Sequence, residues 1–219
     1  MALVREADLA GRRVLDVGCG TGRLLAELAQ RYDVDPVRID RSPEMIREAR
    51  QLLGADAELH VAPAEALPLR SRSVERATMT MVAHHLDRLT AFREIHRVLV
   101  PRGRLAVAST DPEALSTFWM APLFPQYVAV DSQRLPSAGS LTDDLAAAGF
   151  YLERVAVREE RVFDRETALA KLRGRAYSSF AFMSDEEYAE GVARAEHELP
   201  AVISYTLRIL IAVGTRGDS

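Results

Sequence analysis

The residues of this chain that are best suited to chemistry lie close to its start. Segment 14–22 reads VLDVGCGTG, an apolar run broken by one acid and followed by three glycines at every second position. Glycine has no Cβ and tolerates positive φ, so such a turn lets a ligand lie directly on the backbone. The apolar run is typical of a buried parallel strand, and the helix-like stretch 24–32 would begin beside that ligand. The spacing predicts a nucleotide-like cofactor loop in which Gly18, Gly20 and Gly22 contact the cofactor.

The spacing of the glycines excludes two common phosphate-binding loops. The P-loop requires a lysine after its glycines, and none follows here. The dinucleotide fingerprint requires a third glycine at the position of Arg23. Asp16, two residues before the loop, would repel a pyrophosphate but suits a cationic ligand. S-adenosylmethionine, which carries an ammonium and a sulfonium, is such a ligand.

A second acid lies where a ribose would need it. Segment 37–40, Val-Arg-Ile-Asp, reads as a short strand that ends in the carboxylate of Asp40. In α/β nucleotide-binding folds an acid at this place accepts hydrogen bonds from both ribose hydroxyls. Ser42 then caps a helix that begins with a proline, and Met45 in its first turn could cover one face of an adenine.

Further motifs follow in an order that is typical of one large family. After the two segments above come Glu65-Ala66-Leu67-Pro68, His84-His85-Leu86 and Glu94-Ile95-His96-Arg97-Val98-Leu99. With this ordered set the chain resembles the class I S-adenosylmethionine-dependent methyltransferases, specifically the broad small-molecule methyltransferase group. The resemblance is close over roughly residues 12–110 and holds only in pattern beyond them.

Strand-like and helix-like segments alternate along the chain. Strands are expected at 13–18, 37–40, 58–62, 74–81, 104–110, 151–161 and 203–215, and helices at 24–32, 43–53, 88–100 and 141–149. The alternation predicts an α/β fold whose parallel sheet is covered by helices on both faces. The resemblance implies a Rossmann-like three-layer sandwich with seven mostly parallel strands in the order 3-2-1-4-5-7-6 and an antiparallel strand at the edge.

Composition fits one domain that spans all 219 residues. Hydrophobic residues make up 48% of the chain, enough for a large core. The chain has 28 lysines and arginines and 32 aspartates and glutamates, which gives a net charge of −4. It therefore lacks the basic excess that is typical of proteins that bind nucleic acid. With one cysteine, Cys19, no internal disulfide can form, and no run of 18 apolar residues is present. We therefore expect a cytoplasmic protein without nucleic-acid or membrane partners.

Two segments are expected to cover the acceptor substrate. The family normally carries several dozen residues before the glycine loop as a lid, whereas Asp16 is nearly at the start here. Segment 111–137 bears the aromatic Phe118, Trp119 and Tyr127, which either line a hydrophobic substrate pocket or bury a loop against the sheet. Segment 164–200 is expected to hold two helices, the second of which opens with a capping box from Ser184 to Glu187.

The adenine end of the site departs from the family pattern. Relatives place an acid after the third strand, where it accepts a hydrogen bond from the adenine amino group, and this chain has Pro63 there. The backbone N–H of Ala64 remains able to contact the ring, and Glu65 could substitute for the acid. The candidate cofactor-binding residues are Asp16, Gly18, Gly20, Gly22, Asp40, Met45, Ala64 and Glu65.

His84 and His85 are the candidate catalytic residues. Methyl transfer from a sulfonium is an in-line displacement governed by distance and alignment, so a base helps only when the acceptor must lose a proton. Histidine titrates near neutrality, and both residues follow the fourth strand at the correct edge of the sheet. The alternative is a structural signature shared by relatives with unrelated acceptors. The spacing of the histidines matches no metal site.

Three functions remain open. The first is a methyltransferase for a small-molecule acceptor, at O, N or C. The second is a methyltransferase for RNA, DNA or protein, although Met79-Thr80-Met81-Val82 lacks the Asn/Asp-Pro-Pro-Tyr/Phe tetrapeptide of enzymes that methylate nucleic-acid amino groups. The third is a binding or scaffold protein, as a homodimer, that retains the fold without turnover. Loops encode the acceptor, so the fold does not identify it.

Overall fold

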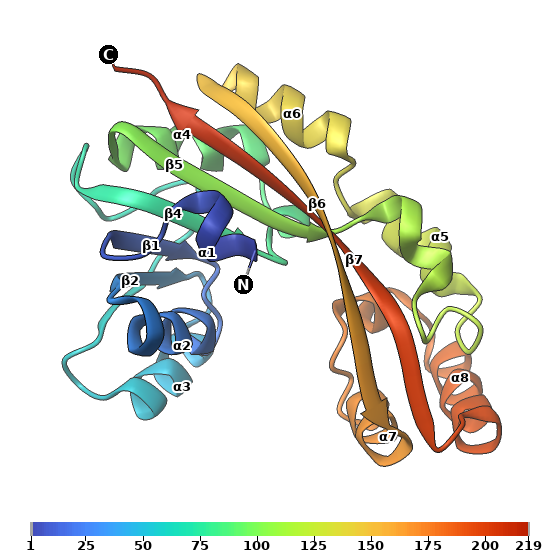
Figure 1. Ribbon diagram of the computed structural model, residues 1–219. Coiled ribbons are helices and arrows are strands. Elements are labelled where there is room, and N and C mark those ends of the chain that lie inside the picture. Colours follow the sequence, from blue (N-terminus) through green and yellow to red (C-terminus); the bar gives the residue numbers. More distant parts are fainter. Residues whose placement is uncertain (1, 219) are drawn as a thin grey trace. The chain divides into compact units, whose positions relative to one another are not determined.

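The structure is a computed structural model that describes residues 2–218, apart from the side chains of residue 2 and residues 153–158 (Figure 1). The chain divides into two compact units. Unit 1 comprises Met1–Ser109, Ala138–Ala156 and Leu210–Ser219, and unit 2 comprises Thr110–Ser137 and Val157–Ile209. The two segments expected to cover the substrate, 111–137 and 164–200, both fall within unit 2.

One seven-stranded sheet in the order β3-β2-β1-β4-β5-β7-β6 runs through the fold. The strands are β1 Arg13–Val17, β2 Asp35–Asp40, β3 Glu58–Val61, β4 Val74–Thr80, β5 Leu99–Thr110, β6 Phe150–Asp164 and β7 Val202–Arg216. β1 pairs in parallel with β2 and β4, β2 with β3, and β4 with β5. β7 is antiparallel to its neighbours β5 and β6, as Figure 1 shows. The strand order and the mostly parallel α/β architecture expected from the sequence are confirmed.

Helices cover both faces of the sheet in unit 1. They are α1 Ala2–Ala7, α2 Arg23–Tyr32, α3 Pro43–Leu53, α4 Arg88–Val98 and α6 Ala138–Ala147, with a short 3₁₀ helix, η1, at Ala83–His85. Apolar side chains of α4 and α6 pack with the central strands into the main hydrophobic core. The helices α1, α2 and α3 lie on the opposite face (Figure 1). These layers bring the carboxyl ends of β1, β2 and β4 to one edge.

The boundary between α4 and β5 differs from the sequence expectation. The helix ends at Val98 and the strand already begins at Leu99, although residues 88–100 were expected to be helical and the strand to begin at 104. Between Val74 and Arg76 the β4–β5 register shifts, so that their partners on β5 are Leu99 and Arg104. The proline and glycine that were read as the end of the helix therefore lie in a β-bulge, a place where strands accept such residues.

Unit 2 is built around a separate aromatic core. Its helices are α5 Gln126–Arg134, α7 Arg165–Arg173 and α8 Asp185–Glu198, with 3₁₀ helices η2 Pro112–Thr117 and η3 Ser178–Phe182. The predicted capping box is confirmed: Ser184 Oγ accepts from the Glu187 N–H (3.2 Å), and Glu187 Oε2 accepts from the Ser184 N–H (2.8 Å). The two helices expected in segment 164–200 are α7 and α8.

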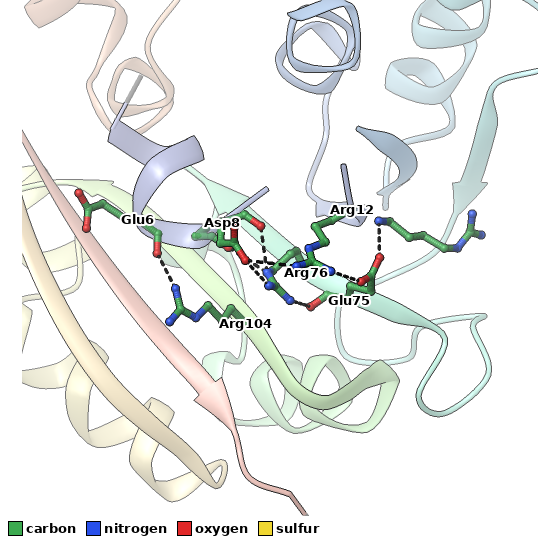
Figure 2. Close-up of polar contacts among 8 residues, drawn as sticks. Glu6, Asp8, Arg12, Glu75, Arg76 and Arg104 are labelled. Carbon is green, nitrogen blue, oxygen red and sulfur yellow. Dashed lines mark hydrogen bonds and ion pairs between the residues drawn. The ribbon is translucent and has the colours of Figure 1, made fainter. Parts of the chain in front are cut away.

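Arg76 on β4 ties the N-terminal helix α1 to the sheet (Figure 2). Its Nε donates to the carbonyl oxygens of Ala7 and Asp8, both at 3.1 Å, and its Nη2 pairs with Asp8 Oδ2 at 2.5 Å. The neighbouring Glu75 accepts from Arg12 Nη1 at 3.0 Å. The guanidinium thus meets the carbonyl end of the α1 dipole. Glu75 and Arg76 thus hold the N-terminal segment against the sheet.

Replacing Arg76 by methionine is expected to lower the free energy of unfolding by about 2–3 kcal/mol, because two carbonyls and a carboxylate lose a largely buried cation. Urea unfolding followed by circular dichroism measures this loss. Arg5→Met is the matched control, since Arg5 is 77% exposed and pairs with its neighbour Glu6, so a change within about 0.5 kcal/mol is expected. Equal losses in both variants would contradict the anchoring role of Arg76.

Candidate active site

A cavity of about 340 Å³ opens at the carboxyl ends of the central strands of unit 1. Ligands of open α/β sheets bind at such an edge. Four predicted site residues line it: Gly18, Asp40, Ala64 and His85. Its remaining lining residues come from the ends of β1 and β2 and from the segments after β3 and β4, namely Val17, Ile39, Arg41, Ser42, Ala62, Val82 and Leu86.

The three glycines of the loop all have positive φ, but for different steric reasons. A Cβ on Gly18 would lie 2.4 Å from Val82 Cγ2, and one on Gly22 would lie 2.8 Å from Leu53 Cδ1. A Cβ on Gly20 would meet no atom within 4 Å. Packing within the protein therefore requires Gly18 and Gly22, whereas the space over Gly20 is open for a ligand.

Asp40 is held at the wall of the cavity by backbone donors. Its Oδ2 accepts from the Gly20 N–H and its Oδ1 from the Ser42 N–H, both at 2.9 Å. Ser42 Oγ in turn accepts from the Met45 N–H at 3.2 Å, which confirms Ser42 as the N-cap of α3. Met45 is half-buried in the first turn of α3 and is not among the residues that line the cavity. The carboxylate of Asp40 is thus fixed in position before any ligand arrives.

Asp16 is a buried acid directly below the glycine loop. It is 2% exposed, and its Oδ1 accepts a hydrogen bond from Thr78 Oγ1 at 3.0 Å. Burial raises the pKa of Asp16 to about 7, although the Thr78 hydroxyl and the charge of Arg38 oppose the rise. A cation bound beside this carboxyl would favour its ionised form.

The affinity of Asp16 for a cationic ligand is therefore expected to depend on pH. With a pKa of about 7, its ionised fraction falls from about nine tenths at pH 8 to about one tenth at pH 6. Calorimetric titration with S-adenosylmethionine should show a dissociation constant that rises about tenfold over this range. Asp16→Asn, which has no carboxyl to titrate, should bind weakly with little pH dependence, and a slope equal to that of the wild type would contradict this role.

Residues after β3 occupy distinct places. Ala64 is buried in the cavity wall, and Pro63 is exposed. Glu65 Oε1 accepts from the Asp87 N–H at 3.1 Å, and Glu65 is not among the cavity-lining residues. The Glu65 carboxylate thus contacts the N-cap of α4, and its expected contact with the cofactor stays a prediction.

The rings of His84 and His85 contact each other, with centroids 4.0 Å apart, but the two residues differ in exposure. His85 is exposed and lines the cavity, whereas His84 is half-buried and is not among the lining residues. Of the two candidates, His85 is therefore the one that lines the cavity, and a catalytic role for either stays a prediction. In the part of the chain that the structure describes, no group of three or more His, Cys, Asp or Glu side chains could hold a metal ion.

The predicted substrate residues pack together in the core of unit 2. Phe118, Trp119 and Tyr127 are 9%, 8% and 3% exposed. The Phe118 ring stacks on Tyr127 with centroids 5.5 Å apart, and Trp119 Nε1 donates to the Tyr177 hydroxyl at 3.3 Å. These contacts hold segments 111–137 and 164–200 in one unit, and a role in binding the substrate stays a prediction.

Arg38 is a buried charged residue beside Asp16 that the sequence motifs did not reveal. It lies in β2 opposite Asp16 of β1 and is 3% exposed. Burial lowers the pKa of its guanidinium, against the charge of Asp16. The signal in the sequence was a charged residue between two apolar ones, Val37 and Ile39, in a strand that reads as buried.

The sheet order, the glycine-rich turn after β1 and the acid at the end of β2 are typical of α/β folds that bind nucleoside-type cofactors. Comparison with known proteins narrows this class. A family model described as a methyltransferase domain matches residues 15–107. The chain belongs to the class I S-adenosylmethionine-dependent methyltransferases.

Individual matches cover between 67% and 100% of the chain. It is 33% identical over 153 residues to the O-methyltransferase cnsE of Penicillium expansum, a match that covers 67% of this chain and 55% of that protein. The chain thus spans little more than half the length of that relative. The YcgJ protein from Bacillus subtilis superposes with a TM-score of 0.67 at 19% identity, over 100% and 97% of the two chains. Geranyl diphosphate C-methyltransferase from Streptomyces coelicolor, solved with S-adenosyl-L-homocysteine, gives 0.60 at 16% identity, over 98% and 77%.

No described helix has the length and hydropathy needed to cross a lipid bilayer.

Proposed function

We propose that this chain binds S-adenosylmethionine in the cavity at the ends of β1 and β2 and transfers its methyl group to a small-molecule acceptor. The observation that carries the proposal is the position of the Asp40 carboxylate, which lies in the cavity wall and is bonded to the glycine loop. The carboxylate is bonded to the Gly20 N–H, and the space over that glycine is open. A nucleoside can thus lie on the loop with its ribose hydroxyls at Asp40. The family match supports this choice of cofactor.

The remaining walls suit the other parts of that cofactor. Ile39, Ala62 and Ala64 offer apolar surface for an adenine. Asp16, one residue before the lining residue Val17, offers a buried carboxylate for the ammonium of the amino-acid end. When bound, the cofactor supplies an activated methyl group. The protein then has to align the acceptor and exclude water.

His85 is proposed to accept the proton of a hydroxyl acceptor. It is the exposed histidine of the cavity wall, and a positioned base contributes typically 10²–10⁴-fold to a proton-transfer step. One sequence relative is an O-methyltransferase, and one protein of similar fold is a C-methyltransferase. Oxygen and carbon are therefore both candidate acceptor atoms in the experiments below.

His85→Ala is expected to reduce kcat about a hundredfold for a hydroxyl acceptor while the dissociation constant of the cofactor changes little. Steady-state kinetics and calorimetry together measure both. His84→Ala is the adjacent control, and its kcat should stay near that of the wild type. If the two variants lost activity equally, the doublet would act structurally and His85 would not be the base.

Pro63 favours a second candidate function, a protein that binds the cofactor without turnover. The acid that the family places at this position to accept from adenine is absent. One missing hydrogen bond costs about 0.5–1.5 kcal/mol, or up to roughly tenfold in affinity. Losing this hydrogen bond would lower the affinity for the cofactor but would not prevent the cofactor from binding.

Thermal unfolding with and without ligand tests the proposal. At 100 times its dissociation constant, S-adenosylmethionine or its demethylated product should add ~2.7 kcal/mol, a rise in Tm of roughly 5–10 °C for a chain of this size. No shift at millimolar concentration would contradict the proposal. Incubation with a methyl-labelled cofactor and a metabolite extract then distinguishes the two candidates, because only an enzyme transfers the label.

A further inference from the structure

A second cavity lies at the edge of the sheet opposite to the candidate active site. It has a volume of about 540 Å³, and all its lining residues belong to unit 1. The end of β7 meets the start of β5 there, whereas the first cavity lies at the carboxyl ends of the parallel strands (Figure 1). The lining residues are Arg102, Tyr151, Thr215, Arg216, Gly217 and Asp218. Two cations and an aromatic ring thus share a cavity that the proposed function does not use.

Arg216 fixes one positive charge in the wall of this second cavity. It is 7% exposed, and its Nη1 donates to the carbonyl oxygens of His96, Arg97 and Leu99 at 2.7, 3.3 and 2.7 Å. Burial lowers the pKa of its guanidinium, and the charge of the neighbouring Arg72 lowers it further. The guanidinium nevertheless stays protonated, because arginine does not lose its proton in proteins. An anion in the cavity would be attracted by both charges.

Arg102 has a backbone conformation that glycine adopts more readily. Its φ is +61°, in the left-handed region, and it lies in the β-bulge at the start of β5. A side chain at this φ costs free energy relative to glycine. The Arg102 side chain is 83% exposed, and its Nε lies 3.9 Å from Asp218 Oδ1, in a surface pair that contributes little to stability. Stability therefore does not account for an arginine at this position, whereas binding of an anion would.

The charge and shape of the second cavity favour a phosphate ester that carries a flat ring. The three arginines described above and the carboxylate of Asp218 leave two net positive charges at the cavity. A phosphate monoester carries about −1.5 to −2 at pH 7, and its oxygens match the donor fork of arginine. The Tyr151 ring is 73% exposed, so a second ring can stack on it. The volume lies within the range of small-molecule sites, about 300–1,000 Å³.

We propose that the second cavity binds a small organic phosphate, with the phosphate group at Arg102 and Arg216 and a flat ring on Tyr151. This site is distinct from the cavity proposed for S-adenosylmethionine, because no residue lines both. The inference goes beyond the proposed function and does not depend on it, so either can fail while the other stands.

Phenyl phosphate is the probe, because it joins a phosphate to a flat ring and contains no adenosine. Backbone amide shifts of isotopically labelled protein are followed at constant ionic strength. We expect saturable shifts at Thr215 and Gly217, and a dissociation constant about three- to tenfold lower than that of inorganic phosphate, because a stacked ring adds affinity. The same shifts should appear in the presence of millimolar S-adenosylhomocysteine, which is expected in the other cavity.

Arg102→Gly separates ligand binding from folding. Glycine adopts the positive φ without strain, so the variant should fold with a Tm close to that of the wild type. Its affinity for phenyl phosphate should fall about tenfold or more, because a charge-assisted hydrogen bond is lost. Tyr151→Ser should reduce the affinity for phenyl phosphate to that for inorganic phosphate. Asp218→Asn should raise the affinity for both probes, since it removes a carboxylate that repels them.

Arg175→Gly is the matched control. Arg175 also has a positive φ, +46°, and is 49% exposed, but it lies in unit 2 and does not line the cavity. Its replacement should leave the affinity for phenyl phosphate unchanged. The absence of saturable shifts at Thr215 and Gly217, equal affinity of the wild type and Arg102→Gly, or shifts confined to the first cavity would overturn the proposal. Should Arg102→Gly not fold, the affinities of Tyr151→Ser and Asp218→Asn decide.

Discussion

Asp40→Asn is expected to weaken the binding of S-adenosylmethionine about a hundredfold or more. The carboxylate is the proposed acceptor for two ribose hydroxyls, and hydrogen bonds to a charged group contribute about 1.5–3 kcal/mol each. The asparagine would also present an NH₂ group toward the N–H of Gly20 or Ser42, which now donate to Asp40. Calorimetric titration gives the two dissociation constants.

Asp35→Asn is the matched control for Asp40. Asp35 lies at the opposite end of β2, where its 63% exposed carboxylate pairs with Arg13. It should bind the cofactor as the wild type does, and surface pairs of this kind contribute little to stability. An affinity of Asp40→Asn within about threefold of the wild type would contradict the ribose assignment.

Gly20→Ala is expected to abolish cofactor binding while the protein remains folded. The φ of +53° at this position costs alanine about 1–2 kcal/mol, and the new Cβ would meet no protein atom within 4 Å. A ligand that lies directly on the loop would collide with that methyl group. We expect at least a hundredfold loss of affinity by calorimetry, together with a small loss of stability in urea unfolding.

Gly22→Ala should show the reverse pattern. Its Cβ would lie 2.8 Å from Leu53 Cδ1 and 3.1 Å from Arg38 Cδ, so the ligand-free protein itself should be destabilised by more than Gly20→Ala. For the first variant, an affinity of Gly20→Ala equal to that of the wild type would contradict the prediction that the cofactor lies on the loop at Gly20.

Most of the sheet could be predicted because its signals are local. Apolar runs such as 14–17 mark buried strands, and the resemblance supplied the strand order. α1 was not predicted, because a six-residue helix has no periodic pattern and depends on a distant residue, Arg76, for its fixation. The early start of β5 was missed for a related reason, since the bulge around Pro101 is defined by its pairing with β4.

The residues of the candidate site also fall into two groups, those whose place depends on nearby sequence and those whose place depends on distant segments. Asp40 and the cap at Ser42 could be placed from spacing, because Asp40 Oδ1 and Ser42 Oγ each accept from a backbone N–H two or three residues further along the chain. The direction of Glu65 toward Asp87 and the burial of Arg38 depend on contacts between segments, which spacing does not encode. The aromatic side chains of segment 111–137 were recognised as a group, but only the structure shows that they pack on one another.

A crystal structure of the protein with S-adenosylhomocysteine bound tests the central claim most directly. The account predicts the nucleoside in the cavity at the ends of β1 and β2, with both ribose hydroxyls within hydrogen-bond distance of Asp40 and the ligand passing over Gly20. A ligand bound elsewhere, or a ribose turned away from Asp40, would contradict it.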